Sequence, residues 1–184
     1  MKRIVALLML FVTLLTFVSC SAEQEEVSVP DGFLQAEKNG ADYEFFYPDT
    51  WILERNDAGV KSVYVSENDF SNVNVTAFTA SYEYADLASY AKEYYFEQFE
   101  SNFKNLSIEK NQDGSIKGSA LKIDGCPAYA VNYSAEFGGE TYSFRVWFIS
   151  CDGYIYTVLY TAKEALFEEH LTLASKTAEF IRFN

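Results

Sequence analysis

One histidine and three cysteines are the residues of this 184-residue chain whose types lend themselves to acid–base, nucleophilic or metal chemistry. His170 lies beside the apolar stripe of an expected helix, and a catalytic triad would need a nucleophile and an orienting acid around it. The sequence contains neither a GxSxG nor an HExxH pattern. Cys and His are too few for a zinc site, and the polar segment 66–72 lacks the spacing and the glycine of an EF-hand. We therefore expect a partly buried structural histidine, no enzyme activity, no catalytic residues, no metal and no cofactor.

The N-terminus has the pattern of a secretory signal. Lys2 and Arg3 precede an apolar run over residues 4–18, which is shorter than the roughly 20 residues that span a bilayer. The run ends in FVSC at 17–20, which resembles a bacterial lipobox with Phe in place of the usual Leu. A lipobox is cut before a cysteine that has been diacylated. The alternative is an ordinary secretory signal in which Cys20 is coincidental.

This interpretation divides the chain into three parts. Residues 1–19 would be the lipoprotein signal peptide, 20–32 a lipidated acidic tether, and 33–184 one domain. Because several acyl chains hold a protein at a membrane more firmly than one, we expect an extracytoplasmic protein, lipid-anchored to the bacterial membrane through Cys20.

The other two cysteines fall in one expected β-hairpin. Two alternating runs flank Gly138-Gly139, which fits a two-residue turn. If Phe137 faces Glu140, the same register places Cys126 opposite Cys151, with Cα atoms about 4.5 Å apart. In an extracytoplasmic compartment the pair could form a disulfide, worth about 3 kcal/mol in the chain-entropy model. The alternative is a pair of reduced, partly buried thiols.

Strand-like segments and two amphipathic helices alternate along the rest of the chain. Apolar residues at helical spacing predict a helix over 86–103, capped by Asp86, and a second helix that begins at a capping-box pattern, Thr161 to Glu164. This order predicts an α+β fold with a mainly antiparallel β-sheet flanked by helices on both faces, an α/β/α sandwich. Strands are expected at 33–37, 43–47, 51–55, 61–66, 73–80, 106–110, 116–123, 127–137, 140–151 and 154–161.

Charge and exposed aromatics bear on the partners. The net charge of −13 argues against nucleic acid, which needs clustered Lys and Arg. An aromatic at a loop tip can anchor a protein partner. Phe70, inside the polar segment 66–72, and Tyr82 and Tyr84, before the first helix, are therefore the candidate partner contacts, although Phe70 could equally tuck under its own loop, which we favour.

The stretch YEFFYPDTW, residues 43–51, ends an aromatic strand at Pro48, which cannot donate to a ladder. An aromatic strand, then Tyr47-Pro48, two turn residues and Trp51, resembles the PsbP/Mog1-like superfamily. The valine strand at 73–78 and the order of elements support this resemblance.

The resemblance implies a helix-flanked antiparallel sheet and a noncatalytic role. We therefore expect a membrane-anchored extracytoplasmic lipoprotein that acts as a binding or accessory module for an unidentified envelope protein or complex. The alternative function is a small-ligand carrier with a tyrosine-lined pocket between sheet and helix.

Overall fold

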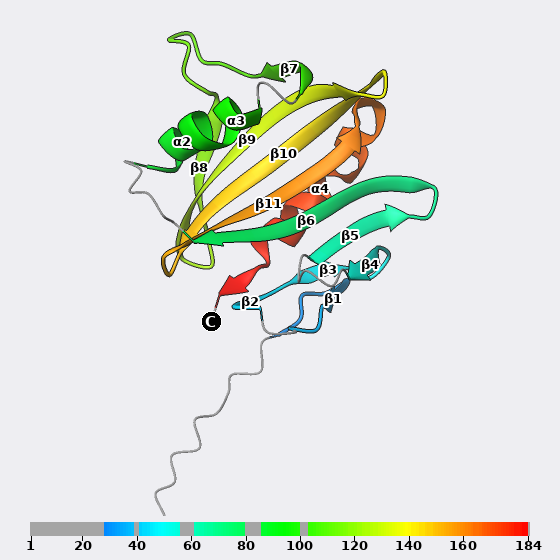
Figure 1. Ribbon diagram of the computed structural model, residues 1–184. Helices are drawn as coiled ribbons and strands as arrows, with labels where there is room; N and C mark the ends of the chain where they lie inside the picture. Colours follow the sequence, from blue (N-terminus) through cyan, green and yellow to red (C-terminus); the bar gives the residue numbers. More distant parts are fainter. Residues whose placement is uncertain (1–27, 39–40, 56–60, 80–85, 100–102, 184) are drawn as a thin grey trace, which may run out of the picture.

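An antiparallel eight-stranded sheet forms the centre of the computed structural model, which describes residues 28–38, 41–55, 61–79, 86–99 and 103–183. The strand order is β4-β5-β6-β11-β10-β9-β7, and β8 pairs with the remaining part of the outer edge of β9 (Figure 1). Its strands are β4 (Ile52–Arg55), β5 (Lys61–Ser66), β6 (Asp69–Thr79), β7 (Lys104–Ile108), β8 (Gly118–Ile123), β9 (Cys126–Phe137), β10 (Glu140–Cys151) and β11 (Tyr154–Lys163).

The β9–β10 hairpin has the register expected from the sequence. Phe137 lies opposite Glu140, and the same alignment continues to Ala128 opposite Ile149. Gly138 and Gly139 both have positive φ, at 60° and 86°, a conformation that glycine adopts without a steric cost. The turn chemistry and the alternating residues agree, so this register is confirmed.

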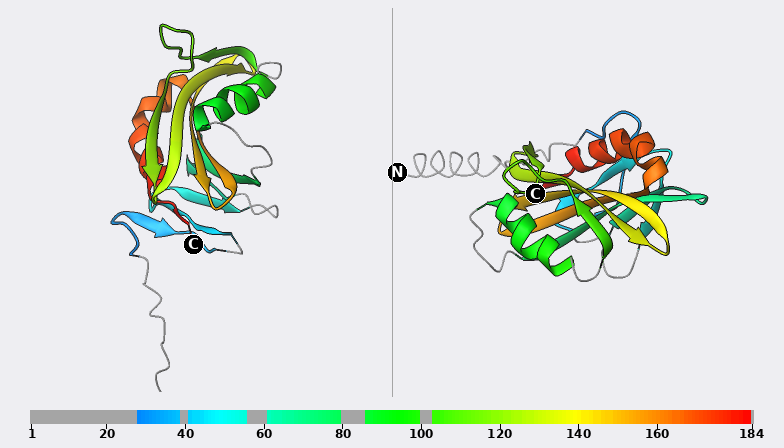
Figure 2. Two further views of the ribbon diagram at one scale, coloured as in Figure 1. Left: turned by 90° about the vertical axis from the view of Figure 1, so that its left-hand side faces the viewer. Right: turned by 90° about the horizontal axis from the view of Figure 1, so that it is seen from above.

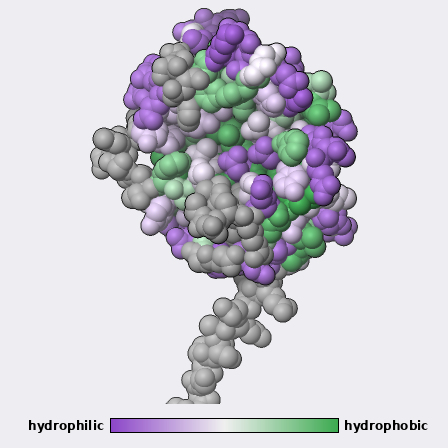
Figure 3. Space-filling model, turned by 45° about the vertical axis from the view of Figure 1, so that its right-hand side comes forward, coloured by the Kyte–Doolittle hydropathy of each residue, from purple (hydrophilic) through white to green (hydrophobic). Residues whose placement is uncertain are grey.

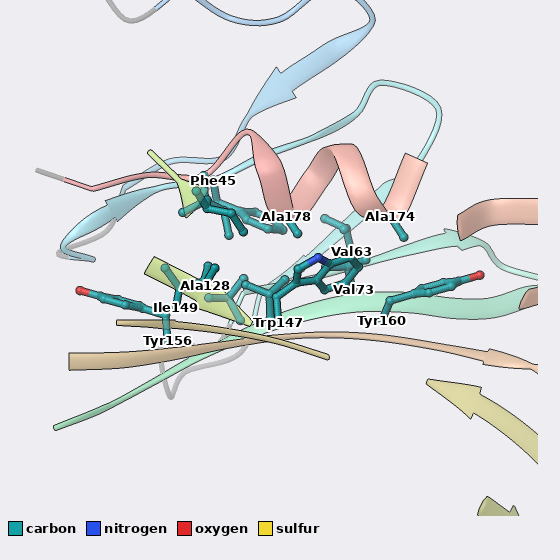
Figure 4. Packing of buried hydrophobic residues seen from close by; sticks show 14 of the residues in the cluster. Phe45, Val63, Val73, Ala128, Trp147, Ile149, Tyr156, Tyr160, Ala174 and Ala178 are labelled. Atoms are coloured by element: carbon teal, nitrogen blue, oxygen red, sulfur yellow. The ribbon is translucent and has the colours of Figure 1, made fainter. Parts of the chain in front are cut away.

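One face of the sheet packs against α4 (Phe167–Glu179), which follows a short 3-10 turn, η3 (Glu164–Leu166). Figure 4 shows Trp147 lying between the sheet and the helix, beneath Ala174 and Ala178. These small residues let the helix approach the large indole closely, and all three side chains are buried.

The second helix begins later than its capping-box pattern indicated. β11 continues to Lys163, and Thr161 pairs with Phe144 on one side and Asn72 on the other. The ladder hydrogen bonds keep Thr161 in the strand, and the local helix cap does not form there, because β11 lies between two long strands. The predicted start at Thr161 is therefore wrong.

The opposite face packs against α2 (Leu87–Tyr90), the π-helical segment η2 (Ala91–Phe96) and α3 (Glu97–Phe99). Figure 2 shows these helices and α4 on opposite sides of the sheet. The Asp86 Oδ1 atom accepts a hydrogen bond of 2.7 Å from the backbone N–H of Ser89, so the predicted cap is confirmed. Compared with a regular α-helix, the π-helical turn shifts which side chains face the sheet, and Tyr90 and Phe96 are both buried.

The N-terminal segment adds two small ladders. β1 (Phe33–Gln35) pairs with β3 (Phe46–Pro48), and β2 (Tyr43–Glu44) pairs with β12 (Arg182–Phe183). The single strand predicted at 43–47 is thus two strands. Phe45, which is fully buried, separates the two strands and packs into the core on the α4 side.

The predicted α+β fold, with helices on both faces of a mainly antiparallel sheet, is confirmed. Pro48 does end its strand, as expected, and Trp51 folds back into the core. Across the described residues, no helix is both long and apolar enough to cross a bilayer.

Candidate functional site

The two domain cysteines meet where the β9–β10 hairpin opens. Cys126 and Cys151 are bonded in the structure, with Cα atoms 5.5 Å apart, which is farther than the 4.5 Å expected from ideal pairing. Each cysteine also pairs with a residue of the neighbouring hairpin: Cys126 lies opposite Ile123 of β8, and Cys151 lies opposite Tyr154 of β11. The crosslink thus ties together the ends of both flanking hairpins. The oxidation state in the cell remains a prediction, and Cys20 lies outside the described residues.

His170, the one histidine of the sequence, contacts a carboxylate from a strand that is distant in the sequence. Its Nε2 atom donates to Asp69 Oδ2 at 2.8 Å, and the two side chains are 12% and 18% exposed. The His170 and Trp51 rings pack edge to face, with 6.3 Å between their centroids. The pair joins α4 to the start of β6. A partly buried histidine was expected; Asp69 was missed, because 101 residues separate the two.

The electrostatics of Asp69 fit this role. Burial alone would raise the pKa of its carboxyl group, but the hydrogen bond from Ser71 and the contact with His170 together lower that pKa. Ser71 donates its backbone N–H to Asp69 Oδ1 at 2.9 Å. The carboxylate therefore accepts hydrogen bonds from both β6 and α4, which makes it a structural clamp.

Phe70 lies beside this clamp and points outward. β6 begins at Asp69, so Phe70 is a strand residue next to a tight turn and is not inside a long loop. Its side chain is 75% exposed, so the favoured expectation that it tucks under its own loop is wrong. Strand alternation explains the difference: Ser71 and Val73 are buried, which turns Phe70 to the opposite face.

Hydrogen bonds between residues close in sequence hold the backbone around Phe70. Ser66 Oγ accepts hydrogen bonds from the backbone N–H groups of Asn68 and Asp69, at 3.3 and 3.2 Å. Asn72 donates its side-chain amide to the carbonyl of Phe70 at 2.9 Å. An exposed aromatic on a braced hairpin loses little conformational entropy on binding, which favours its use as a contact residue.

The sheet carries further exposed apolar side chains. Ile52 and Phe78 share one face of the sheet, since Ile52 pairs with Tyr64, Tyr64 with Asn72, and Asn72 lies an even number of residues from Phe78. The β5–β6 register shifts between Asn72 and Asp69, so Phe70 lies where this ladder is irregular. Figure 3 shows one side of the molecule, where hydrophilic residues lie along the outline and hydrophobic areas lie between them. The other candidate contacts, Tyr82 and Tyr84, lie outside the described residues.

The tyrosines between the sheet and α2–α3 pack against one another. The hydroxyl groups of Tyr95 and Tyr133 lie 3.0 Å apart, and burial raises the pKa of each. The ring of Tyr133 stacks on Phe144, and Tyr95 meets Phe148 edge to face. These contacts pack the two tyrosines against each other and against phenylalanines of β10.

A cavity of about 390 Å³ lies on the other face, beyond the start of α4. One tyrosine contributes to its walls, which are otherwise largely hydroxyl, amide and carboxylate groups. The described residues include no group of three or more His, Cys, Asp or Glu side chains placed to hold a metal ion. The lining residues are Ser107, Glu109, Asn132, Tyr133, Ser134, Ser143, Phe144, Glu164, Phe167 and Glu168.

An antiparallel sheet with a helical layer on each face, a central meander and a C-terminal helix defines the PsbP/Mog1-like fold, and this chain has it. The resemblance inferred from Tyr47-Pro48 and Trp51 is confirmed at the level of fold. No protein-family model matches the sequence, and no curated protein does.

Three solved structures illustrate the fold. PsbP (CyanoP) from Synechocystis sp. PCC 6803 has a TM-score of 0.58 and 17% identity, over 86% of this chain and 96% of its own. PA94, a Pseudomonas aeruginosa protein of unknown function, has a TM-score of 0.55 and 16% identity, covering 80% and 94%. LpqN, described as involved in cell envelope biogenesis of Mycobacterium tuberculosis, has a TM-score of 0.54 and 14% identity, covering 83% and 90%.

Proposed function

We propose that this protein is a lipid-anchored, extracytoplasmic lipoprotein that serves as a noncatalytic binding or accessory module for an envelope protein or complex. The signal pattern and Cys20 support the location and the anchor. The description of LpqN as a cell-envelope protein, on a similar fold, is compatible with an accessory role. Fold alone does not determine function, so the proposal depends on a specific surface.

The single observation that carries the proposal is the exposure of Phe70 on a braced hairpin. A large aromatic that is 75% exposed and held by hydrogen bonds on both sides has the properties of an interface anchor. The protein carries a net charge of −13. We therefore expect the partner to offer an apolar pocket for the Phe70 ring, surrounded by Lys and Arg residues. Tyr82 and Tyr84 remain additional proposed contacts.

The test is site-specific crosslinking in intact membranes. A photo-reactive residue replaces Asn68, which lies beside Phe70 in the hairpin turn, and crosslinked products are identified by mass spectrometry. One envelope protein should be recovered reproducibly. Phe70→Ala should reduce that product about tenfold, which corresponds to a typical hot-spot loss.

The matched control is Tyr154→Ala. Tyr154 is an exposed aromatic that pairs with Thr79, at the far end of the same β6–β11 ladder. It should leave the crosslink unchanged. Equal losses from both substitutions, or recovery of lipid with no reproducible protein, would contradict a Phe70-centred interface.

One specific observation supports the carrier function: the cavity of about 390 Å³ is within the size range of small-molecule sites. Its lining combines three glutamates, an asparagine and several hydroxyl groups with Phe144 and Phe167. A thermal-shift screen separates the two functions, since a carrier gains stability when its ligand binds.

A further inference from the structure

A row of three serines forms the floor of the cavity beside α4. Ser107 on β7 pairs with Ser134 on β9, and Ser134 pairs with Ser143 on β10. All three line the cavity. Farther along the same sheet face, β10 carries Trp147 and Ile149 in the apolar core. The sheet surface thus changes from large apolar side chains to small hydroxyl groups where α4 no longer covers it, which leaves space in front of hydroxyl groups.

Carboxylates approach this serine row from two sides. Glu109 follows β7, whereas Glu164 and Glu168 belong to η3 and the first turn of α4. Of these three, Glu109 has a lysine partner, Lys117, at 2.7 Å between Nζ and Oε2, and both side chains of that pair are more than half exposed. A surface pair of this kind is weak and exchanges readily with solvent or with another cation.

A second cation, Arg145, contacts Asn132 of the cavity lining. It donates from Nη1 to Asn132 Oδ1 at 3.4 Å and lies over the ring of Trp147, with 5.2 Å from Cζ to the ring centroid. Desolvation lowers the pKa of Arg145, and Glu179 and Glu168 oppose that effect. The guanidinium therefore offsets part of the charge of Glu168, whereas Glu164 makes no ion pair with another described residue.

Helix stabilisation explains only part of this arrangement. Acidic residues in a first helical turn interact favourably with the helix dipole, and Glu168 and Glu169 both occupy that turn of α4. Glu168 lines the cavity, and Glu169 is not among the lining residues. The dipole accounts for neither the hollow nor the serine row, so these point to a ligand.

We propose that this cavity binds an extended organic cation with two or more ammonium groups, either a free polyamine or a lysine-bearing peptide segment. Carboxylates from different elements, Glu109 after β7 and Glu164 and Glu168 in η3 and α4, suit spaced ammonium groups, each of which can donate three hydrogen bonds to carboxylate and hydroxyl oxygens. The carboxylates among the described residues are not grouped as a compact metal ion requires. The net charge of −13 raises the local concentration of any cation. This proposal is independent of the Phe70 interface.

Isothermal titration of the full lipoprotein in neutral detergent tests the proposal, with three probes: spermidine, an acetylated Lys-Gly-Lys peptide amide, and neutral chitobiose. At low salt at least one of the two cationic probes should bind, and its affinity should fall as salt rises. Binding of spermidine alone identifies the free polyamine as the source, and binding of the peptide alone identifies a peptide segment. No binding of either cation, or tighter binding of chitobiose, overturns the proposal.

Variants locate the binding. Glu164→Gln and Glu168→Gln should each weaken the cation about tenfold, because each removes one charge-assisted contact. Glu169→Gln removes the same charge from the same turn of α4 and should change the affinity less than twofold. Ser143→Asn narrows the cavity without changing the charge and should abolish binding, while far-UV circular dichroism confirms an unchanged fold. Equal effects of Glu168→Gln and Glu169→Gln would show diffuse attraction and refute the site.

Discussion

The Asp69–His170 contact should stabilise the fold, and its strength can be measured. Asp69→Asn keeps the size of the side chain but removes the charge. The replaced carboxylate accepts two hydrogen bonds, from Ser71 at 2.9 Å and from His170 at 2.8 Å. The amide can keep the first of these through its oxygen, whereas its NH₂ group faces the donor of His170. The loss is therefore one hydrogen bond to a charged group in a mostly buried place, about 2 kcal/mol.

Urea unfolding followed by tryptophan fluorescence gives this free energy, because Trp51 lies against His170. For a domain of this size, about 2 kcal/mol corresponds to a decrease in Tm of about 4–8 °C. His170→Gln completes a double-mutant cycle, in which we expect a coupling free energy of about 1–2 kcal/mol. A coupling below about 0.3 kcal/mol would refute the conclusion that these two side chains clamp β6 to α4.

The matched control is Asp113→Asn. Asp113 makes a similar local contact to that of Asp69, since its Oδ1 accepts from the backbone N–H of the residue two positions on, Ser115, at 3.0 Å, and also from the Ser115 hydroxyl at 2.6 Å. It lies on the surface, and Ser115 is its only hydrogen-bond partner within the described part of the chain. Its replacement should leave the unfolding midpoint nearly unchanged, which separates the tertiary clamp from a local turn.

The pH dependence of the clamp has a definite sign. Because the folded-state pKa of Asp69 is lowered, the ionised carboxylate contributes stability above the ordinary carboxyl pKa of about 3.9, and this contribution is lost as the pH falls through the lowered value. The difference in free energy of unfolding between the native protein and Asp69→Asn should therefore shrink below about pH 4. A difference that persists unchanged at pH 2 would contradict this explanation.

Three further predictions concern other parts of the chain. If Cys126 and Cys151 form a disulfide in the cell, thiol alkylation before reduction should leave both unlabelled, whereas labelling of both would show reduced thiols. Cys151→Ser should lower the free energy of unfolding by about 3 kcal/mol, as expected for a loop with a sequence separation of 25. Gly118→Ala should lower the free energy of unfolding in urea by about 1–2 kcal/mol, because an added Cβ would collide with the ring of Tyr129. That ring is held in place by a hydrogen bond of 3.1 Å from its hydroxyl to the carbonyl of Ile116. An unchanged free energy of unfolding would mean that the ring moves aside freely. Cys20→Ala should abolish incorporation of labelled palmitate in growing bacteria and release the protein from the membrane fraction, whereas unchanged labelling would exclude Cys20 as the lipid site.

Local patterns were sufficient to predict the central meander. Gly138-Gly139 permits the positive φ of a two-residue turn, and the alternating residues on either side allow one register that keeps each face consistent. The first helix was predictable from its spacing and from the Asp86 cap. Its π-helical turn was not, because one extra residue per turn leaves no clear signal in the sequence.

Tertiary contacts decided the features that involve distant segments. The strand at 43–47 became two strands because β1 and β12 each offer a different partner. β11 extended to Lys163, past a local capping signal, because long strands flank it on both sides. The exposure of Phe70 depends on the burial of its neighbour Ser71, which the sequence pattern of 66–72 does not indicate.

What the sequence determined by itself is therefore what neighbouring residues control: turn geometry, strand alternation, the cap of the first helix and the signal pattern that ends at Cys20. The pairing of His170 with Asp69, and the third serine of the cavity floor, Ser107, were decided by the tertiary structure alone. The physical reason is that these contacts join segments brought together only when the sheet and its helices pack, so no local preference along the chain records them.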